Sequence, residues 1–418
     1  MLFNIALSSL AHRKITVLLT LFSIAISVAI ILSVEHIRQE AKNSFTRTIS
    51  GTDLIVGARS GRINLLLYSV FRIGNATNNM SWKSYELISQ QKGIRWAIPI
   101  SLGDSHKGYR VLGTTEDYFS YYQYGKKTAL QFNQGETFRH VYDVVLGAEV
   151  AKKLNYQIGQ KIVLSHGIAD VSFMQHEDKP FTIVGILEPT GTPVDQTLHI
   201  SLAGMEAIHI DWKNGAPIPG LKVSAEEALT KDLTPKTITA IYLGLNNKIL
   251  TFRIQRKINN YRNEPLMAIL PGVALSELWQ TMNMVEKVLA LIAALVGFAS
   301  MLGMITMVLS TLKQRQREII ILRTIGAPRW FIFCLIELEV IVIALAGIIL
   351  GLGILWLSMT ISQPIIANHY GLFLTSHPFT VSTGIYSLII LGIAASLAVI
   401  PAAIAYRQSL GKALILRD

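Results

Sequence analysis

Residues 313–329, KQRQREIIILRTIGAPR, place five basic side chains around a single acid, Glu318. The stretch lies between two long apolar runs and ends in Gly326-Ala327-Pro328. A surplus of Lys and Arg on one side of a membrane would explain the positive charge, but it would explain neither Glu318 nor the Gly-Ala-Pro break. A short helix that buries one acid between flanking arginines, with Ile319 and Leu322 as its apolar face, could fill a groove on a partner protein. We therefore predict a protein-binding segment.

Histidines supply the second candidate chemistry. Six of the ten histidines lie within residues 51–275: His106, His140, His166, His176, His199 and His209. Imidazole together with carboxylate suits Zn²⁺ or another transition metal, and His106, His166, His176 and His209 are the candidate ligands. No pair has the short spacing of a local metal motif, so a site would require convergence of distant residues. The alternative is that these histidines are solvated or satisfied within the core.

Motifs for other chemistry are absent from the sequence. There is no G-x-x-x-x-G-K-[ST], G-x-S-x-G, H-E-x-x-H or Cys-x-x-Cys. We predict no catalytic residue and no cofactor site for ATP and Mg²⁺ in this chain, so any energy must come from a partner. The lone cysteine, Cys334, excludes an intramolecular disulfide.

Four apolar runs determine the fold class. Residues 15–34, 288–312 and 381–406 carry no charge, and residues 330–360 carry only Glu337 and Glu339. Each run can cross ~30 Å of hydrocarbon as a helix, and the first is too long for a cleaved signal peptide. We predict a membrane α-helical protein with four transmembrane helices and a large α+β extracytoplasmic domain between the first two.

The Lys and Arg residues near the spans predict the orientation. With both termini cytoplasmic, ten basic and two acidic residues fall on one side, and the segment between the first two spans lies outside. The net charge of +11 therefore reflects membrane topology, and we predict no nucleic-acid partner. The outer segment shows short strand and helix patterns that favour two subdomains, and helical sequence beyond spans one and two predicts two stalks.

The predicted order of parts follows from these patterns. It is an interfacial or cytoplasmic helix at 1–14, transmembrane helix one with its stalk at 15–50, the outer domain at 51–275, a second stalk with transmembrane helix two at 276–312, the basic segment at 313–329, transmembrane helix three at 330–361, an outer loop at 362–380, transmembrane helix four at 381–406 and a cytoplasmic tail at 407–418.

This order resembles the MacB/FtsX/LolC-E-like permeases of ABC transporters, the type VII or mechanotransmission class. Residues 315–327 resemble the family's E-R-x-x-E-I-x-x-x-R-x-x-G-A coupling stretch, although Gln314 replaces its leading acid. Residues 145–159 resemble its L-G-x-x-x-A-x-x-L…G segment, residues 184–195 a later strand and turn, and residues 401–410 its closing P-A-x-x-A motif.

The resemblance implies a multi-pass protein of the bacterial inner membrane, in contact with membrane lipid, with its large domain in the periplasm. It also implies cytoplasmic ABC ATPase subunits, a second permease copy as a homodimer, and a periplasmic or outer-membrane partner. The chain itself would not be an enzyme. The implied ATPase-coupling residues are Arg315, Arg317, Glu318, Ile319, Leu322, Arg323 and Gly326.

The implied function is to couple ATP hydrolysis by the partner to a conformational change of the periplasmic domain, for export or extraction of an envelope substrate. The alternatives are an FtsX-like regulator of a periplasmic enzyme or sensor, a metal-linked envelope transport system, and a membrane-anchored binding module without a motor.

Overall fold

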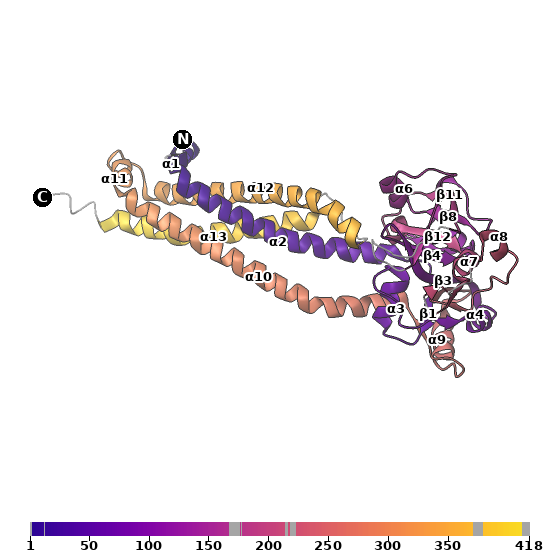
Figure 1. Cartoon of the computed structure of the whole chain (residues 1–418). Coiled ribbons are helices and arrows are strands. Elements are labelled where there is room, and N and C mark those ends of the chain that lie inside the picture. Colours follow the sequence, from indigo (N-terminus) through magenta and orange to yellow (C-terminus); the bar gives the residue numbers. More distant parts are fainter. Residues whose placement is uncertain are drawn as a thin grey trace. The chain divides into compact units, whose positions relative to one another are not determined.

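The computed structural model describes residues 2–11, 13–166, 176, 178–213, 216–217, 223–370 and 379–411. The chain divides into two compact units (Figure 1). The helical unit comprises Met1–Glu40, Asn283–Ile365 and Leu374–Asp418. The sheet unit comprises Ala41–Met282 and Ile366–Phe373. Three of the unit boundaries therefore fall inside continuous helices rather than in linkers.

Long helices build the helical unit. They are α1 (Leu2–Ala11), α2 (Lys14–Thr48), α10 (Pro271–Gln314), α11 (Gln316–Thr324), α12 (Arg329–Tyr370) and α13 (Val381–Gly411). Within the described residues, α2, α10, α12 and α13 are long and apolar enough to cross a membrane. Figure 1 shows these four lying side by side.

One predicted boundary is wrong. Helix α12 continues through Pro364 to Tyr370, so the first part of the segment predicted as an outer loop at 362–380 is helical. Proline removes one backbone donor and usually ends a helix, but here Ile365 to Tyr370 continue the helix beyond it. Residues 371–378 of that predicted loop, and residues 412–418 of the predicted tail, lie outside the described residues.

Small residues bring α12 against α2. A Cβ atom on Gly351 would lie 2.8 Å from the Ala25 carbonyl oxygen, and one on Gly347 would lie 2.6 Å from Ile24 Cγ2. Neither distance leaves room for a side chain. Glycines four residues apart thus allow the close helix contact that packing in lipid requires.

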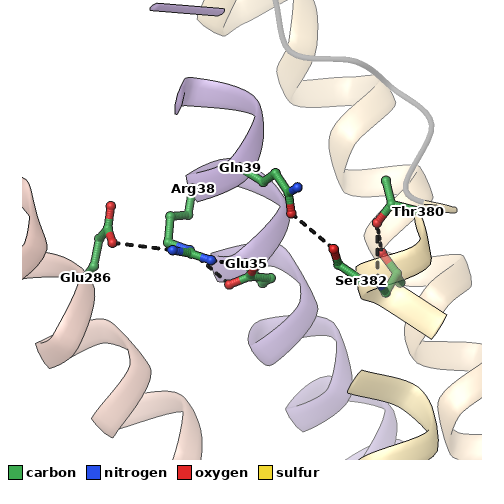
Figure 2. A network of polar contacts seen from close by, with 7 residues as sticks. Glu35, Arg38, Gln39, Glu286, Thr380 and Ser382 are labelled. Carbon is green, nitrogen blue, oxygen red and sulfur yellow. Dashed lines mark hydrogen bonds and ion pairs between the residues drawn. The ribbon is translucent and has the colours of Figure 1, made fainter. Parts of the chain in front are cut away.

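Polar contacts join three of these helices near one end (Figure 2). Arg38 of α2 donates two hydrogen bonds to Glu35, at 2.7 and 3.0 Å, and its Nη1 lies 3.8 Å from Glu286 of α10. Ser382 of α13 donates to Gln39 Oε1 at 3.2 Å. Because Arg38 and Glu35 are partly exposed, these contacts align the helices more than they stabilise them.

The sheet unit is built on one mixed sheet. Among the described residues its strand order is β17-β1-β16-β3-β4-β12-β8-β11-β7, with β10 also paired to β3 and β9 to β11. The strands are β1 (Leu54–Ala58), β3 (Ile94–His106), β4 (Tyr109–Thr114), β7 (Phe132–Gly135), β8 (Asp143–Leu146), β9 (Lys161–Ile162), β10 (Ser165–His166), β11 (Phe181–Leu187), β12 (Thr197–Ser201), β16 (Ala240–Leu245) and β17 (Leu266–Ile269).

Shorter elements complete this unit. The helices are α3 (Arg62–Val70), α4 (Trp82–Ser89), α5 (Asp117–Tyr121), α6 (Ala148–Leu154), η1 (Pro193–Gln196), α7 (Leu202–His209), α8 (Ala225–Ala228), η2 (Lys248–Leu250) and α9 (Thr251–Asn259). The remaining strands pair as β2 (Met80–Ser81) with β15 (Thr237–Ile238), β5 (Gln123–Tyr124) with β6 (Thr128–Ala129), and β13 (Trp212–Lys213) with β14 (Ala216–Pro217).

One long strand, β3, belongs to both halves of the sheet, so the two predicted subdomains would share it. Its first part, Ile94 to Ile100, pairs with β16, and its second part, Ser101 to His106, pairs with β4. The pairing with β4 shifts register between Leu102 and Ser105. Strand β3 therefore joins the two halves of the outer segment into one continuous hydrogen-bonded sheet.

A close backbone contact explains one glycine in the sheet unit. A Cβ atom on Gly147 would lie 2.3 Å from the Val194 carbonyl oxygen and 2.5 Å from the Asp195 carbonyl carbon. Asp195 is buried and accepts hydrogen bonds from the Thr190 and Gly191 amides, each at 2.8 Å. The start of α6 and the turn before β12 thus fit together only because residue 147 has no side chain.

Candidate functional site

The basic segment (residues 313–329) is anchored to α12 through Arg315. This residue separates α10 from α11, and its side chain is only 6% exposed. Its Nη1 donates to Glu339 Oε1 at 2.7 Å and its Nε donates to Glu318 Oε2 at 2.8 Å. Glu339 is itself 8% exposed. A buried arginine with carboxylates on both sides is electrically satisfied, so it fixes the start of α11 against α12.

The predicted burial of Glu318 within the segment is wrong, because its side chain is 62% exposed. The buried acid is Glu339, twenty-one positions later in the chain. An acid within an apolar run is conspicuous in the sequence, so Glu339 could be singled out there. Its partner, Arg315, could be identified only from the positions of the helices.

The apolar face of α11 also differs from the prediction. Ile319 packs against the core of the helical unit, and Leu322 is half-buried. The exposed apolar side chains are Ile321 and Ile325, at 60% and 75%. The side chain of Arg317 lies outside the described part of the structure. The surface that α11 offers to a partner therefore carries Glu318, Ile321 and Ile325.

A specific cap ends α11. Gly326 has φ +96°, its amide donates to the Arg323 carbonyl at 3.1 Å, and the Ala327 amide donates to the Leu322 carbonyl at 3.0 Å. This is the Schellman arrangement, in which a left-handed glycine satisfies the last carbonyls of a helix. Arg323 Nη1 adds a bond to the Ala327 carbonyl at 3.3 Å. Gly326 thereby sets the turn that leads into α12.

Three of the four candidate histidines converge in the sheet unit. His166 of β10, His176, and His209 at the end of α7 meet the buried carboxylate of Asp104 of β3; these four residues are called the histidine cluster here. One ligand atom from each lies within 4.8 Å of the others. His166 Nδ1 is 3.1 Å from Asp104 Oδ1, and His209 Nε2 is 3.4 Å from Asp104 Oδ2.

The fourth candidate, His106, does not join them. Its Nδ1 contacts the Val163 carbonyl at 2.6 Å and its Nε2 contacts the Tyr156 hydroxyl at 2.8 Å. Both ring nitrogens are occupied, so His106 is satisfied within the core. Burial lowers its pKa, which keeps the ring neutral.

The electrostatics of the histidine cluster follow from its burial. Burial would raise the pKa of Asp104, but hydrogen bonds with His166 and His209 outweigh it and lower the pKa to about 2. Burial lowers the pKa of His176 to about 4, so at neutral pH this ring is uncharged. Burial would lower the pKa of His209, but its hydrogen bond with Asp104 outweighs burial and raises that pKa. The cluster therefore combines an ionised carboxylate with one neutral imidazole, His176.

Sequence reasoning missed Asp104 and Trp212. Asp104 lies directly opposite His166 in the antiparallel pairing of β3 with β10, so the two side chains share one face. The Trp212 ring packs 4.9 Å from His166 and 4.8 Å from His176, measured between ring centroids. The strand pairing that joins Asp104 to His166 was the signal, but β10 has only two residues and gave no recognisable pattern.

Comparison with models of known protein families shows which family this chain belongs to. The model of the MacB-like periplasmic core domain matches residues 17–241, which is more than half of the chain. The model of the FtsX-like permease C-terminal domain matches residues 290–413. The chain belongs to the MacB/FtsX-like ABC transporter permeases. The MacB/FtsX resemblance drawn from the sequence is thus confirmed.

Solved structures similar to this permease include two outer domains. The periplasmic region of MacB from Actinobacillus actinomycetemcomitans is 14% identical, with a TM-score of 0.33, over 60% of this chain and 97% of that one. The extracellular domain of the noncanonic ABC-type transporter YknZ from Gram-positive bacteria is 10% identical, with a TM-score of 0.31, over 52% and 99%. No curated protein matches the sequence.

Membership of the MacB/FtsX family has three consequences. Together with the apolar helices it indicates a membrane protein with a periplasmic domain, the sheet unit. Permeases of this family are components of ABC transporters that work with ATPase partners, and many form dimers. They are generally not catalytic themselves.

Proposed function

We propose that this permease docks a separate cytoplasmic ABC ATPase on its basic segment and transmits the ATP-driven movement of that motor to the periplasmic domain. Both termini would be cytoplasmic, in a bacterial inner membrane, and two copies would form a homodimer with one ATPase subunit on each. The work done would be export or extraction of an envelope substrate from the periplasmic side.

The anchoring of Arg315 is the observation that carries this proposal. An arginine buried between Glu318 and Glu339 joins α11 to α12 by charged hydrogen bonds at 2.7 and 2.8 Å. Geometry of this kind is rigid, because each guanidinium nitrogen has a fixed direction. A force applied to α11 would therefore reach α12 directly rather than being absorbed by a loose loop.

The exposed face of α11 supports docking. Ile321 and Ile325 lie four residues apart, on one side of a helix, and are exposed next to the charged Glu318. Two apolar anchors with a neighbouring charge are typical of a helix that fits a hydrophobic groove on a partner. Neither isoleucine belongs to the core of the helical unit within the described residues.

Continuous helices supply a path for movement. Helix α10 has 44 residues and α2 has 35, which correspond to about 66 and 52 Å at ~1.5 Å per residue. Both exceed the ~30 Å hydrocarbon thickness. The boundary between the two units lies inside each of them. Movement of the basic segment would thus pass along unbroken backbone into the sequence of the sheet unit.

Co-purification tests the docking step. The permease is co-expressed in its native host with the ABC ATPase that carries a Walker A motif, and the complex is isolated in detergent. We expect Ile321→Asp and Ile325→Asp each to reduce the recovered ATPase by ~30-fold, as loss of an interface hot spot does. Ile249→Asp, at an exposed isoleucine in the sheet unit, is the matched control and should leave recovery unchanged. Equal recovery from all three variants would disprove docking at α11.

The rate of ATP hydrolysis tests transmission. With Arg315→Gln the ATPase should still bind, but hydrolysis should no longer respond to changes in the periplasmic domain. A periplasmic extract that stimulates the wild-type complex would favour transport, whereas activation of a periplasmic enzyme without such stimulation would favour the FtsX-like regulatory alternative. Full stimulation of the Arg315→Gln complex would contradict the rigid connection.

A further inference from the structure

The histidine cluster has the ligand set and the spacing of a transition-metal site. Its nearest ligand atoms are separated by 3.1 Å from His166 Nδ1 to Asp104 Oδ1, by 3.2 Å from His166 Nδ1 to His209 Nε2, and by 3.4 Å from His209 Nε2 to Asp104 Oδ2. A tetrahedral site with ~2.0–2.1 Å bonds has edges of about 3.3–3.4 Å. Each of these separations is close to such an edge, with His166 and His209 facing different oxygens of the Asp104 carboxylate, and the ligand atom of His176 lies within 4.8 Å of the others.

A hydrogen bond fixes the orientation of His209. Its Nδ1 lies 2.9 Å from the Met205 carbonyl oxygen, which can only accept, so Nδ1 carries a proton. The other nitrogen, Nε2, faces Asp104 and His166, and a metal ion would replace the proton that Nε2 donates to Asp104. A metal-binding histidine characteristically donates its other nitrogen to a backbone carbonyl in this way.

His176 contributes a buried nitrogen that has no hydrogen-bond partner in the described part of the chain. Its side chain is buried, and its Nε2 makes no hydrogen bond to any described residue. An imidazole nitrogen removed from water without a hydrogen bond costs free energy. A metal ion inside the cluster would satisfy it.

Neighbouring residues pack around the cluster and leave two of its histidines partly exposed. The ring of Trp212 lies against His166, His176 and His209, with centroid distances of 4.8 to 5.9 Å. Lys179, whose amide donates to the His176 carbonyl, is neutralised by Asp211 through two contacts of 3.1 Å. His166 and His209 remain partly exposed, which gives an ion a route from solvent.

We propose that Asp104, His166, His176 and His209 bind one Zn²⁺ ion in the periplasmic domain. Three nitrogens and one carboxylate oxygen suit Zn²⁺, whereas Mg²⁺ and Ca²⁺ prefer oxygen ligands alone. Four protein ligands leave no open position for a reacting water, so the ion holds β3, β10 and α7 together and does not catalyse hydrolysis. This site is independent of ATPase docking on α11, and failure of either proposal leaves the other standing.

Metal content of the full-length protein tests the site. The permease is purified in detergent, its affinity tag is removed, metal is stripped with a chelator, and Zn²⁺ is titrated by calorimetry at micromolar concentration. We expect one Zn²⁺ per chain for the wild type and for His140→Ala, a matched control at an exposed histidine of the same domain. His176→Ala and Asp104→Asn should each weaken binding by at least ~100-fold, since even outer-shell substitutions weaken metal sites by ~10–100-fold.

Two further readouts keep the test decisive when a variant folds poorly. Co²⁺ bound by the wild type should show the intense visible absorption of a tetrahedral nitrogen and oxygen site, and should quench Trp212 fluorescence. Added Zn²⁺ should raise the melting temperature of the wild type and of His140→Ala, but not of His176→Ala. A wild type that binds no Zn²⁺ at micromolar concentration, or variants that bind it as the wild type does, would overturn the proposal.

Discussion

The basic segment and the sheet unit each contain a buried polar cluster, and the two differ in how their charges are balanced. Arg315 donates hydrogen bonds to the carboxylates of Glu318 and Glu339, and its positive charge neutralises the buried Glu339. In the histidine cluster one carboxylate, Asp104, faces three imidazoles, and the Nε2 of His176 has no hydrogen-bond partner among the described residues. A cluster whose charges and hydrogen bonds are balanced by its own members holds helices together. A cluster that contains a nitrogen without a hydrogen-bond partner can bind a ligand there.

Breaking the balance at Arg315 should produce the largest effect. Arg315→Met leaves the Glu339 carboxylate buried without a counter-charge, and we expect a loss of about 3–5 kcal/mol in the free energy of unfolding. Thermal unfolding in detergent measures it. The double variant Arg315→Met/Glu339→Gln should recover most of this loss, because the buried charge is then removed.

Glu318→Gln is the control for that comparison. Its carboxylate is exposed and hydrogen-bonds the same arginine, so its loss should change stability by at most ~1 kcal/mol. If Glu318→Gln destabilised the protein as much as Arg315→Met, the anchoring role of Glu339 would be refuted.

A smaller effect is expected at the other end of the basic segment. Gly326→Ala places a side chain at φ +96°, where no atom blocks a Cβ, so the cost comes from the backbone conformation alone. We expect a loss of about 1–2 kcal/mol, typical of a left-handed non-glycine residue. Gly353→Ala, inside α12 with equally open surroundings, should instead be neutral or slightly stabilising. Similar destabilisation by both substitutions would argue against the Schellman cap.

A pH-dependent effect distinguishes a third kind of buried histidine. His199 is buried against Tyr118 and Phe119, and burial, with a contribution from the charge of Arg72, lowers its pKa to about 3 from the ordinary 6.5. Between these pH values the unfolded chain binds the proton more readily, so the free energy of unfolding should fall as the pH is lowered through this window, by about 1 kcal/mol per pH unit.

Denaturant unfolding at pH 7 and pH 5, with chelator present, measures this dependence. The free energy of unfolding should differ less between pH 7 and pH 5 in His199→Asn than in the wild type. The substitution should not change the response to Zn²⁺, because the described metal-ligand group does not include residue 199. An unchanged pH dependence in the variant would show that His199 is not buried in its neutral form.

Local patterns in the sequence predicted most of the elements but few of their contacts. The sequence analysis expected short strands in the outer segment, and the structure has strands there such as β4, β11 and β16. The sharing of β3 by both halves of the sheet was not predicted, because nothing local in β3 indicates that its halves pair with different neighbours. Helix α12 continues beyond its predicted end at residue 361, because the prediction followed the apolar run and the helix extends past it to Tyr370.

At the candidate sites too, the sequence identified residues by type but not the contacts they make. His166, His176 and His209 were identified by residue type, but Asp104 and the exclusion of His106 depend on strand register and on the contacts of Val163 and Tyr156. In the basic segment, residue types identified Arg315 and Glu318. The partner Glu339 and the outward direction of Ile321 depend on how α11 lies against the other helices.

The pairing of Asp104 with His166 has a consequence for how the sheet unit unfolds. The two residues are 62 positions apart in the chain, and β10, which carries His166, is only two residues long. An ion that joins them would close a long loop, and such a cross-link acts chiefly by restricting the entropy of the unfolded chain. Zinc would therefore work as a reversible counterpart of the disulfides that this chain, with its single cysteine, cannot form.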